Sequence, residues 1–218
     1  MSKPRSSATL PAIAEPPPSE SPPPITVLTN VLAAVAKWTS ADDTRLHLRL
    51  VVFRDDELIA TDGHRLVRVP CPTYGHTFGI DRAHVLAAAK AQHELEAPRP
   101  RAIQLWPADD GHVRLRLTGP PLQRNVSLKV PAGRVEDYPP IEQVMPQPSV
   151  GVSPQGYVMD PRYLAAVEEV TSAMQPDTHR GVTLAAWGPP DEAGDLLGPM
   201  LFTNAGGARF VIMPMRAP

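Results

Sequence analysis

The sequence contains few groups that could carry out covalent chemistry. The best placed are Asp62 and His64, two residues apart at a polar corner within Leu58–Val69. A carboxylate beside an imidazole can serve as a general base. The chain has no G-x-S-x-G, no P-loop and no H-E-x-x-H, and its one cysteine, Cys71, has no partner at zinc-ligand spacing. We therefore expect no catalytic site, metal site or cofactor, and interpret Asp62 as a turn residue and His64 as a surface residue.

The same corner predicts a β-hairpin. Apolar residues at Leu58–Ala60 lead into Asp62–Gly63, and an Asp-Gly dipeptide tolerates the positive φ angles of a two-residue turn. Apolar and polar residues then mix over His64–Val69, which is typical of a strand with one face in a core. Most hairpins of this kind have no function of their own, so the turn alone does not identify an activity.

Composition limits the class of protein. The chain has 218 residues, a formal net charge of −2 and one cysteine, which favours neither a strongly basic nucleic-acid binder nor a disulfide framework. Proline supplies 28 residues and is concentrated near the start, so residues 1–24 are predicted to be a disordered Pro-rich arm. The sequence shows no signal peptide and no apolar stretch long enough to span a bilayer. We expect a soluble cytoplasmic protein.

Three segments share one plan. Ala- and Leu-rich runs at 31–35, 85–89 and 163–167 lie in predicted helices, and several short strand-like segments follow each helix. Asp81 and Asp160 stand where helix N-caps are expected. In the first unit, the alternation over Leu46–Phe53 predicts a half-buried strand. The repeated pattern predicts an α+β fold of three helix-plus-antiparallel-strand half-repeats.

Three short motifs, in order along the chain, carry a family resemblance. They are ATDGHRL at 60–66, Arg134–Tyr138 followed by Met145–Pro146, and VIMPMR at 211–216. Together they resemble segments of bacterial sliding clamps, the β subunits of DNA polymerase III, over about residues 25–216. The resemblance implies a DNA-clamp-like fold without the family's first domain. It divides the chain into a complete domain at 25–138, a linker at 139–148 and a half-domain at 149–218.

The resemblance also implies recognition instead of catalysis. Sliding clamps hold short apolar peptides from polymerases and repair proteins in a pocket between domains two and three. Apolar side chains would form an adaptable trough and two polar ones its rim. Taken singly, Leu48, Val211 and Met213 are more typical of core residues, and only the joint match of the segments favours a groove. The pocket residues implied here are Leu48, Thr61, Gly63, His64, Arg65, Leu66, Ile141, Val211, Ile212, Met213, Pro214 and Met215.

Duplex DNA is a further implied partner, because clamp helices line the inside of a ring. The candidate DNA-facing residues are Lys37, Arg82, Lys90, His93 and Arg162. Family rings contain twelve units, so three units a chain would need four chains, and an unpaired half-domain would expose apolar faces that favour a homo-oligomer. The alternative is a regulatory interaction module that binds clamp clients or the host replisome without encircling DNA.

Overall fold

The computed structural model describes residues 23–95, 101–108, 110–117, 126–146, 159–174, 181–187 and 198–214. The helices are α1 (Thr29–Ala36), α2 (Arg82–Glu94) and α3 (Pro161–Met174), with two short 3-10 helices, η1 (Leu46–Arg49) and η2 (Ile141–Val144). The strands are β1 (Ile25–Leu28), β2 (Leu50–Arg54), β3 (Glu57–Thr61), β4 (Arg65–Pro70), β5 (Phe78–Asp81), β6 (Ala102–Ala108), β7 (His112–Leu117), β8 (Val126–Pro131), β9 (Val182–Trp187), β10 (Met200–Asn204) and β11 (Arg209–Ile212). The predicted α+β class is confirmed. Most of residues 1–24 lie outside the described residues.

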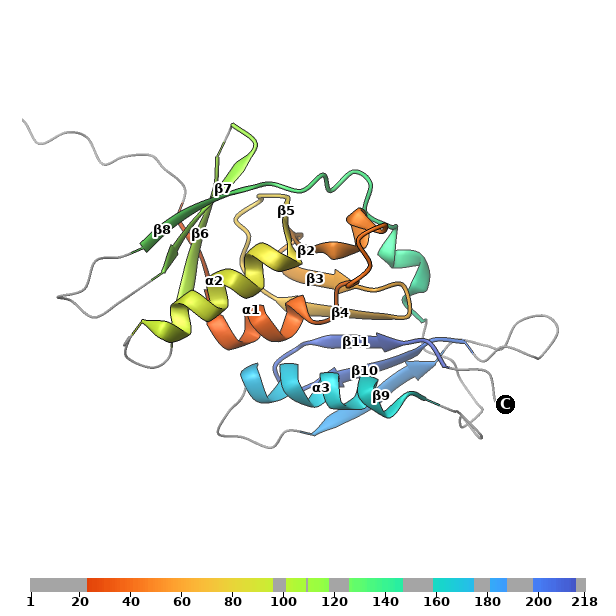
Figure 1. Ribbon diagram of the computed structural model, residues 1–218. Coiled ribbons are helices and arrows are strands. Elements are labelled where there is room, and N and C mark those ends of the chain that lie inside the picture. The colour runs from red at the N-terminus through yellow and green to blue at the C-terminus, as the bar shows by residue number, and fades with distance from the viewer. Residues whose placement is uncertain are drawn as a thin grey trace, which may run out of the picture.

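Two antiparallel sheets form the frame of the molecule (Figure 1). One has four strands in the order β1-β6-β7-β8, and the other has seven in the order β5-β2-β3-β4-β11-β10-β9. The first two repeats exchange a strand, because β1 pairs with β6 and β5 pairs with β2. The third repeat adds its strands to the sheet of the first through β4 and β11. All three units are therefore joined by strand pairing or helix packing.

The main core lies between the two sheets and the helices. Its largest buried side chains include Trp38, Phe53 and Phe210, and the rings of Trp38 and Phe210 lie 5.6 Å apart. A second, smaller core lies on the outer face of the seven-stranded sheet, where the linker packs through Tyr138 and Ile141. The linker region therefore covers part of that face.

The predicted helix starts are confirmed. The side chain of Asp81 accepts a hydrogen bond from the backbone N–H of Ala83 at 2.7 Å, and Asp160 accepts one from the backbone N–H of Arg162 at 2.9 Å. Arg162 also approaches that carboxylate through its side chain, with Nε 2.9 Å from Oδ2. These bonds to Arg162 hold the pKa of Asp160 below its usual range.

The strand predicted over Leu46–Phe53 is wrong in its first half. Residues 46–49 form η1, in which the N–H of Leu48 donates to the carbonyl of Arg45 at 2.9 Å and its carbonyl accepts from Ser40 at 2.8 Å. Leu46 is exposed and Leu48 is buried. The alternating leucines thus do not share a face, because tertiary packing and local hydrogen bonds override the two-residue pattern.

The expectation of an uncovered half-domain is also wrong for the part of the chain that the structure describes. Helix α3 packs against α1 (Figure 1), and its Val167 and Val170 are buried in the main core. Phe210 and Ile212 of β11 enter the same core. β9 remains at the edge of the seven-stranded sheet, so the exposed-face argument for self-association loses most of its basis. Among the described residues, no helix is both long and apolar enough to cross a bilayer.

A buried ion-pair network joins the first repeat, the linker and the third repeat. Arg68 Nε lies 2.6 Å from Oε2 of Glu57, and its Nη1 lies 2.8 Å from Oε1 of Glu142 on η2. Arg209 of β11 pairs with the other oxygen of Glu57. Because Glu57 and Arg68 are both buried, removing one partner leaves a charge without full compensation.

Glu57→Ala should lower the free energy of unfolding by about 3 kcal/mol, since Arg68 would remain buried with one partner on the surface. Urea unfolding followed by circular dichroism measures this loss. The matched control is Asp43→Ala, which removes the exposed carboxylate paired with Arg49 and should cost about 0.5 kcal/mol. Equal losses for both variants would contradict a structural role for the network.

Burial raises the pKa of the Cys71 thiol to about 11, and the nearby Asp56 carboxylate adds to the shift. The thiol ionises near pH 9.0 in the unfolded chain but only near pH 11 in the folded protein. The free energy of unfolding therefore keeps its full value below pH 9.0 and falls as the pH rises toward about 11. The difference in unfolding free energy between the wild type and Cys71→Ala should therefore narrow between pH 9 and pH 11. A difference that stays constant over this range would contradict the shift.

Candidate functional site

The candidate site begins with a row of side chains across three neighbouring strands. Thr61 of β3 is the register partner of Leu66 of β4, and Leu66 is the partner of Val211 of β11. These residues are on the outer face of the sheet, because Leu66 and Val211 belong to the smaller core there. Val211, near the end of the chain, therefore lies beside the first hairpin.

The linker forms one wall of the site. After Tyr138, whose phenol has a pKa raised by burial, Pro139 and Pro140 lead into η2. Ile141 of η2 is buried against the sheet, while Val144 is 41% exposed at the rim. The ion pair between Arg68 and Glu142 described above holds this short helix in place.

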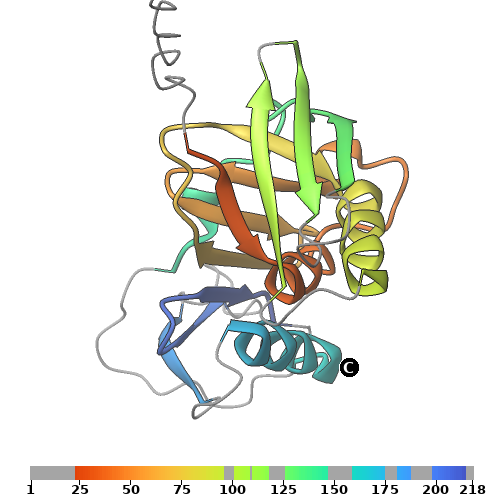
Figure 2. The same cartoon turned by 90° about the vertical axis from the view of Figure 1, so that its left-hand side faces the viewer.

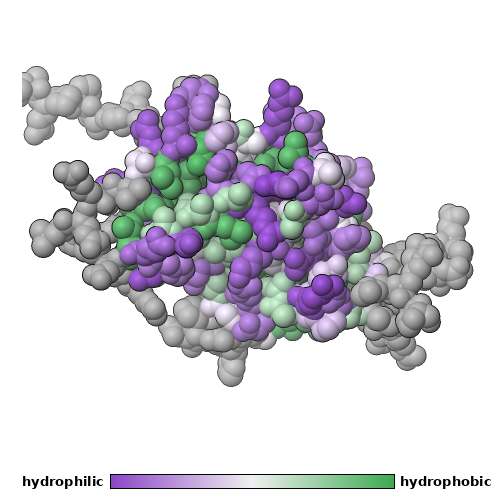
Figure 3. All heavy atoms as spheres, in the orientation of Figure 1, coloured by the Kyte–Doolittle hydropathy of each residue, from purple (hydrophilic) through white to green (hydrophobic). Residues whose placement is uncertain are grey.

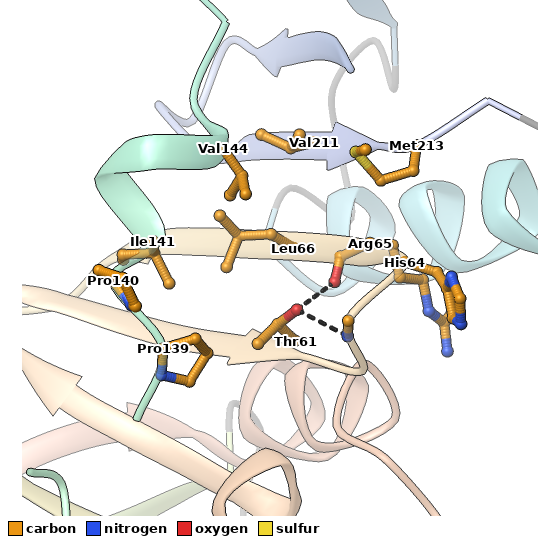
Figure 4. Close-up of a pocket in the computed structure, with 11 residues that line it drawn as sticks. Thr61, His64, Arg65, Leu66, Pro139, Pro140, Ile141, Val144, Val211 and Met213 are labelled. Atoms are coloured by element: carbon orange, nitrogen blue, oxygen red, sulfur yellow. Dashed lines mark hydrogen bonds between the residues drawn. The ribbon is translucent and has the colours of Figure 1, made fainter. Parts of the chain in front are cut away.

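The opposite end is formed by Met213 and the hairpin. The N–H of Met213 donates to the carbonyl of His64 at 2.9 Å, which continues the pairing of β11 with the hairpin. The side chain of Met213 is 37% exposed. The result is an open, mainly apolar pocket with a cavity volume of about 180 Å³ (Figure 4). It is lined by Thr61, Gly63, His64, Arg65, Leu66, Pro139, Pro140, Ile141, Val144, Val211 and Met213.

Hydrogen bonds within the hairpin fix the polar end of the pocket. The hydroxyl of Thr61 donates to the carbonyl of Arg65 at 2.7 Å and accepts from the N–H of Gly63 at 3.1 Å (Figure 4). Asp62 Oδ1 accepts from the N–H groups of His64 and Arg65 at 2.9 and 3.0 Å. The predicted two-residue turn is thus a three-residue loop between β3 and β4, with Gly63 at φ +93°. The Asp62 carboxylate is committed to this loop.

Arg65 does not form the polar rim expected of its side chain. Its Nε lies 2.9 Å from Oδ2 of Asp62, and its Nη2 donates to the carbonyl of Lys37 at 2.8 Å. Its guanidinium carbon lies 5.0 Å from the ring centre of Trp38 and 5.2 Å from that of Tyr163. Alternation along β4 turns this side chain to the helix face, where it links α1, the hairpin and α3.

The structure brings most of the predicted pocket residues together. Eight line the pocket, namely Thr61, Gly63, His64, Arg65, Leu66, Ile141, Val211 and Met213. Leu48, Ile212 and Pro214 are not among the lining residues, and Met215 lies outside the described residues. Leu48 lies below the hairpin, with Cδ1 3.6 Å from the position a Cβ on Gly63 would take.

Ile212 is fully buried in the main core because β11 alternates and turns it to the helix side. Sequence reasoning missed Pro139, Pro140 and Val144, which line the linker wall. The adjacent prolines directly after Tyr138 were an available signal for an extended wall.

The candidate DNA-facing residues are largely engaged within the chain. Lys37 pairs with Glu169, and Arg162 with Asp160. Hydrophilic and hydrophobic residues are interleaved over the helix face (Figure 3).

The remaining candidates, Arg82, Lys90 and His93, lie on α2. Nη1 of Arg82 donates to the carbonyl of Thr39 at 3.2 Å, and Nδ1 of His93 lies 2.9 Å from Nη1 of Arg101. Lys90 is exposed on α2. Within the described ranges, no group of three or more His, Cys, Asp or Glu side chains could hold a metal ion.

This chain resembles known proteins in its fold and not detectably in its overall sequence. No family model and no curated relative matches the sequence. Among solved structures, the β sliding clamp of Caulobacter crescentus is 19% identical with a TM-score of 0.57, covering 95% of this chain and 69% of its own. The sliding clamp of Pseudomonas aeruginosa is 16% identical with a TM-score of 0.58, covering 96% and 71%. The chain therefore has the fold of the DNA polymerase III β sliding clamps and spans about 70% of the length of these structures.

Proposed function

We propose that this protein is a clamp-like replication or repair accessory factor that binds short apolar segments of DNA polymerases or repair proteins. It acts by binding and not by catalysis. The proposal rests on the sliding-clamp fold together with the position of the pocket, where the first hairpin, the linker and the last strand meet.

One observation carries the proposal. The row of Thr61, Leu66 and Val211, buried in the sheet, forms the floor of a pocket between η2 and Met213, next to the part of the same sheet face that the linker covers. Val144 and Met213, one on each side, are among the few large apolar side chains exposed by the described residues. Exposed apolar side chains around a concave floor are typical of a binding site, and methionine adapts to different ligand shapes.

Encirclement of duplex DNA by an oligomer is the weaker part of the proposal. Nonspecific affinity for duplex DNA comes from cations that neutralise phosphates, and here Lys37 and Arg162 already pair with carboxylates. This pairing favours the alternative of a regulatory module that binds clamp clients without forming a ring. Trapping of the protein on closed circular DNA distinguishes the two, because only a ring would be retained.

Val144→Asp should weaken binding of a clamp-binding peptide from a bacterial DNA polymerase by about tenfold or more, since an apolar ligand would desolvate the new carboxylate. Fluorescence anisotropy with the labelled peptide measures the change. Leu164→Asp on α3 is the matched control, because Leu164 is exposed to a similar degree, 43%, away from the pocket. Equal affinity of both variants and the wild type would rule out this pocket.

A second test follows the pocket directly. With methyl-labelled methionine, the NMR signal of Met213 should shift on addition of the same peptide, because its side chain lines the pocket. Met174, at the end of α3 and packed against the main core, should keep its signal. Peptide-induced shifts confined to other methionines would place the ligand elsewhere.

A further inference from the structure

One face of the four-stranded sheet lies in the core, and the opposite face is exposed and is not part of the proposed peptide pocket. Alternating residues of β6 and β7 point inward and are fully buried, namely Ile103, Leu105, Val113, Leu115 and Leu117. The residues between them point to the opposite side, away from the core. Figure 2 looks onto this side, and no described helix crosses in front of the central strands there.

The outward residues form ordered rows. Trp106 of β6 is the register partner of Arg114 of β7, and Arg114 is the partner of Lys129 of β8. The adjacent row runs from Gln104 to Arg116. Directly opposed side chains on one face of an antiparallel sheet have Cβ atoms about 5 Å apart. The half-buried indole of Trp106 therefore lies directly opposite the exposed Arg114, and Arg116 is in the next row.

The described strands of this face carry basic residues and no acidic ones. The described strands β1, β6, β7 and β8 read ITVL, AIQLWPA, HVRLRL and VSLKVP, and contain no aspartate or glutamate. The nearest carboxylate in the described turn is Asp110, whose Oδ2 lies 2.6 Å from Nζ of Lys129. This pairing holds the pKa of Asp110 below its usual range. Arg114 projects from β7, one of the two central strands, on the outward face of the sheet, in a chain whose net charge is −2.

We propose that this outer face binds single-stranded nucleic acid, with Arg114 of β7 contacting a phosphate and Trp106 stacking on a base. Aromatic side chains on an open four-stranded sheet stack on unpaired bases, and neighbouring cations follow the backbone. A duplex fits less well, because the faces of its bases are already covered. The site is separate from the peptide pocket, which lies on the seven-stranded sheet.

The test uses the full chain and a fluorescein-labelled oligothymidylate of about 20 nucleotides, followed by anisotropy at increasing NaCl. Trp106→Ala should weaken binding about 5- to 150-fold, the range for loss of one base-stacking contact, and Trp106→Phe should restore most of the affinity. Arg114→Ser should lower the slope of log K against log salt by about 0.7, the value for one phosphate contact in a single strand.

Arg45→Ser is the matched control, because it removes the same charge from an exposed side chain near the Gly63 hairpin, away from this face, and should leave the slope unchanged. Circular dichroism shows whether each variant is folded. Val144→Asp should bind the oligonucleotide as the wild type does, which separates this site from the peptide pocket. Wild-type affinity in Trp106→Ala, equal binding of duplex and single strand, or tighter binding of a glutamate-rich peptide would each overturn the proposal.

Discussion

The pairing of β4 with β11 is the interaction on which the rest of the structure depends. It joins a strand of the first repeat to a strand near the end of the chain, with Leu66 opposite Val211. Closing so long a loop costs entropy, and this cost is offset by burial of Phe210 and Ile212 in the main core. The same pairing places α3 against α1. A single pairing between distant segments thus joins the third unit to the first two.

The register of this pairing also determines the pocket. Along β11, Phe210 and Ile212 turn inward, while Val211 and Met213 turn to the outer face. A shift of one residue would move the aromatic ring to the surface and a pocket residue into the core. The large apolar area buried on the helix side therefore selects the register. The composition of the pocket on the other side follows from it.

Residues whose roles are set locally could be predicted from the sequence. Asp81 and Asp160 cap helices because their side chains bond to backbone two residues ahead. The prediction for Leu46–Phe53 is wrong in its first half, because alternation alone cannot distinguish a strand from a 3-10 turn held by nearby backbone hydrogen bonds. Arg65 lines the pocket, as the family motif implied, but its guanidinium packs between Trp38 and Tyr163. That contact depends on where the third repeat docks, which no local pattern reveals.

The capacity of a basic residue to bind anions depends on whether a carboxylate lies beside it. Lys37 on the helix side pairs with a carboxylate of another helix, so its field is largely cancelled at short range. Arg114 lies in a sheet whose described strands carry no carboxylate, and its field extends into solvent up to the screening length. A net charge near zero therefore says little about polyanion binding. What matters is whether opposite charges lie on the same face of the protein. In a sheet, the alternation of side chains along each strand decides which charged residues share a face.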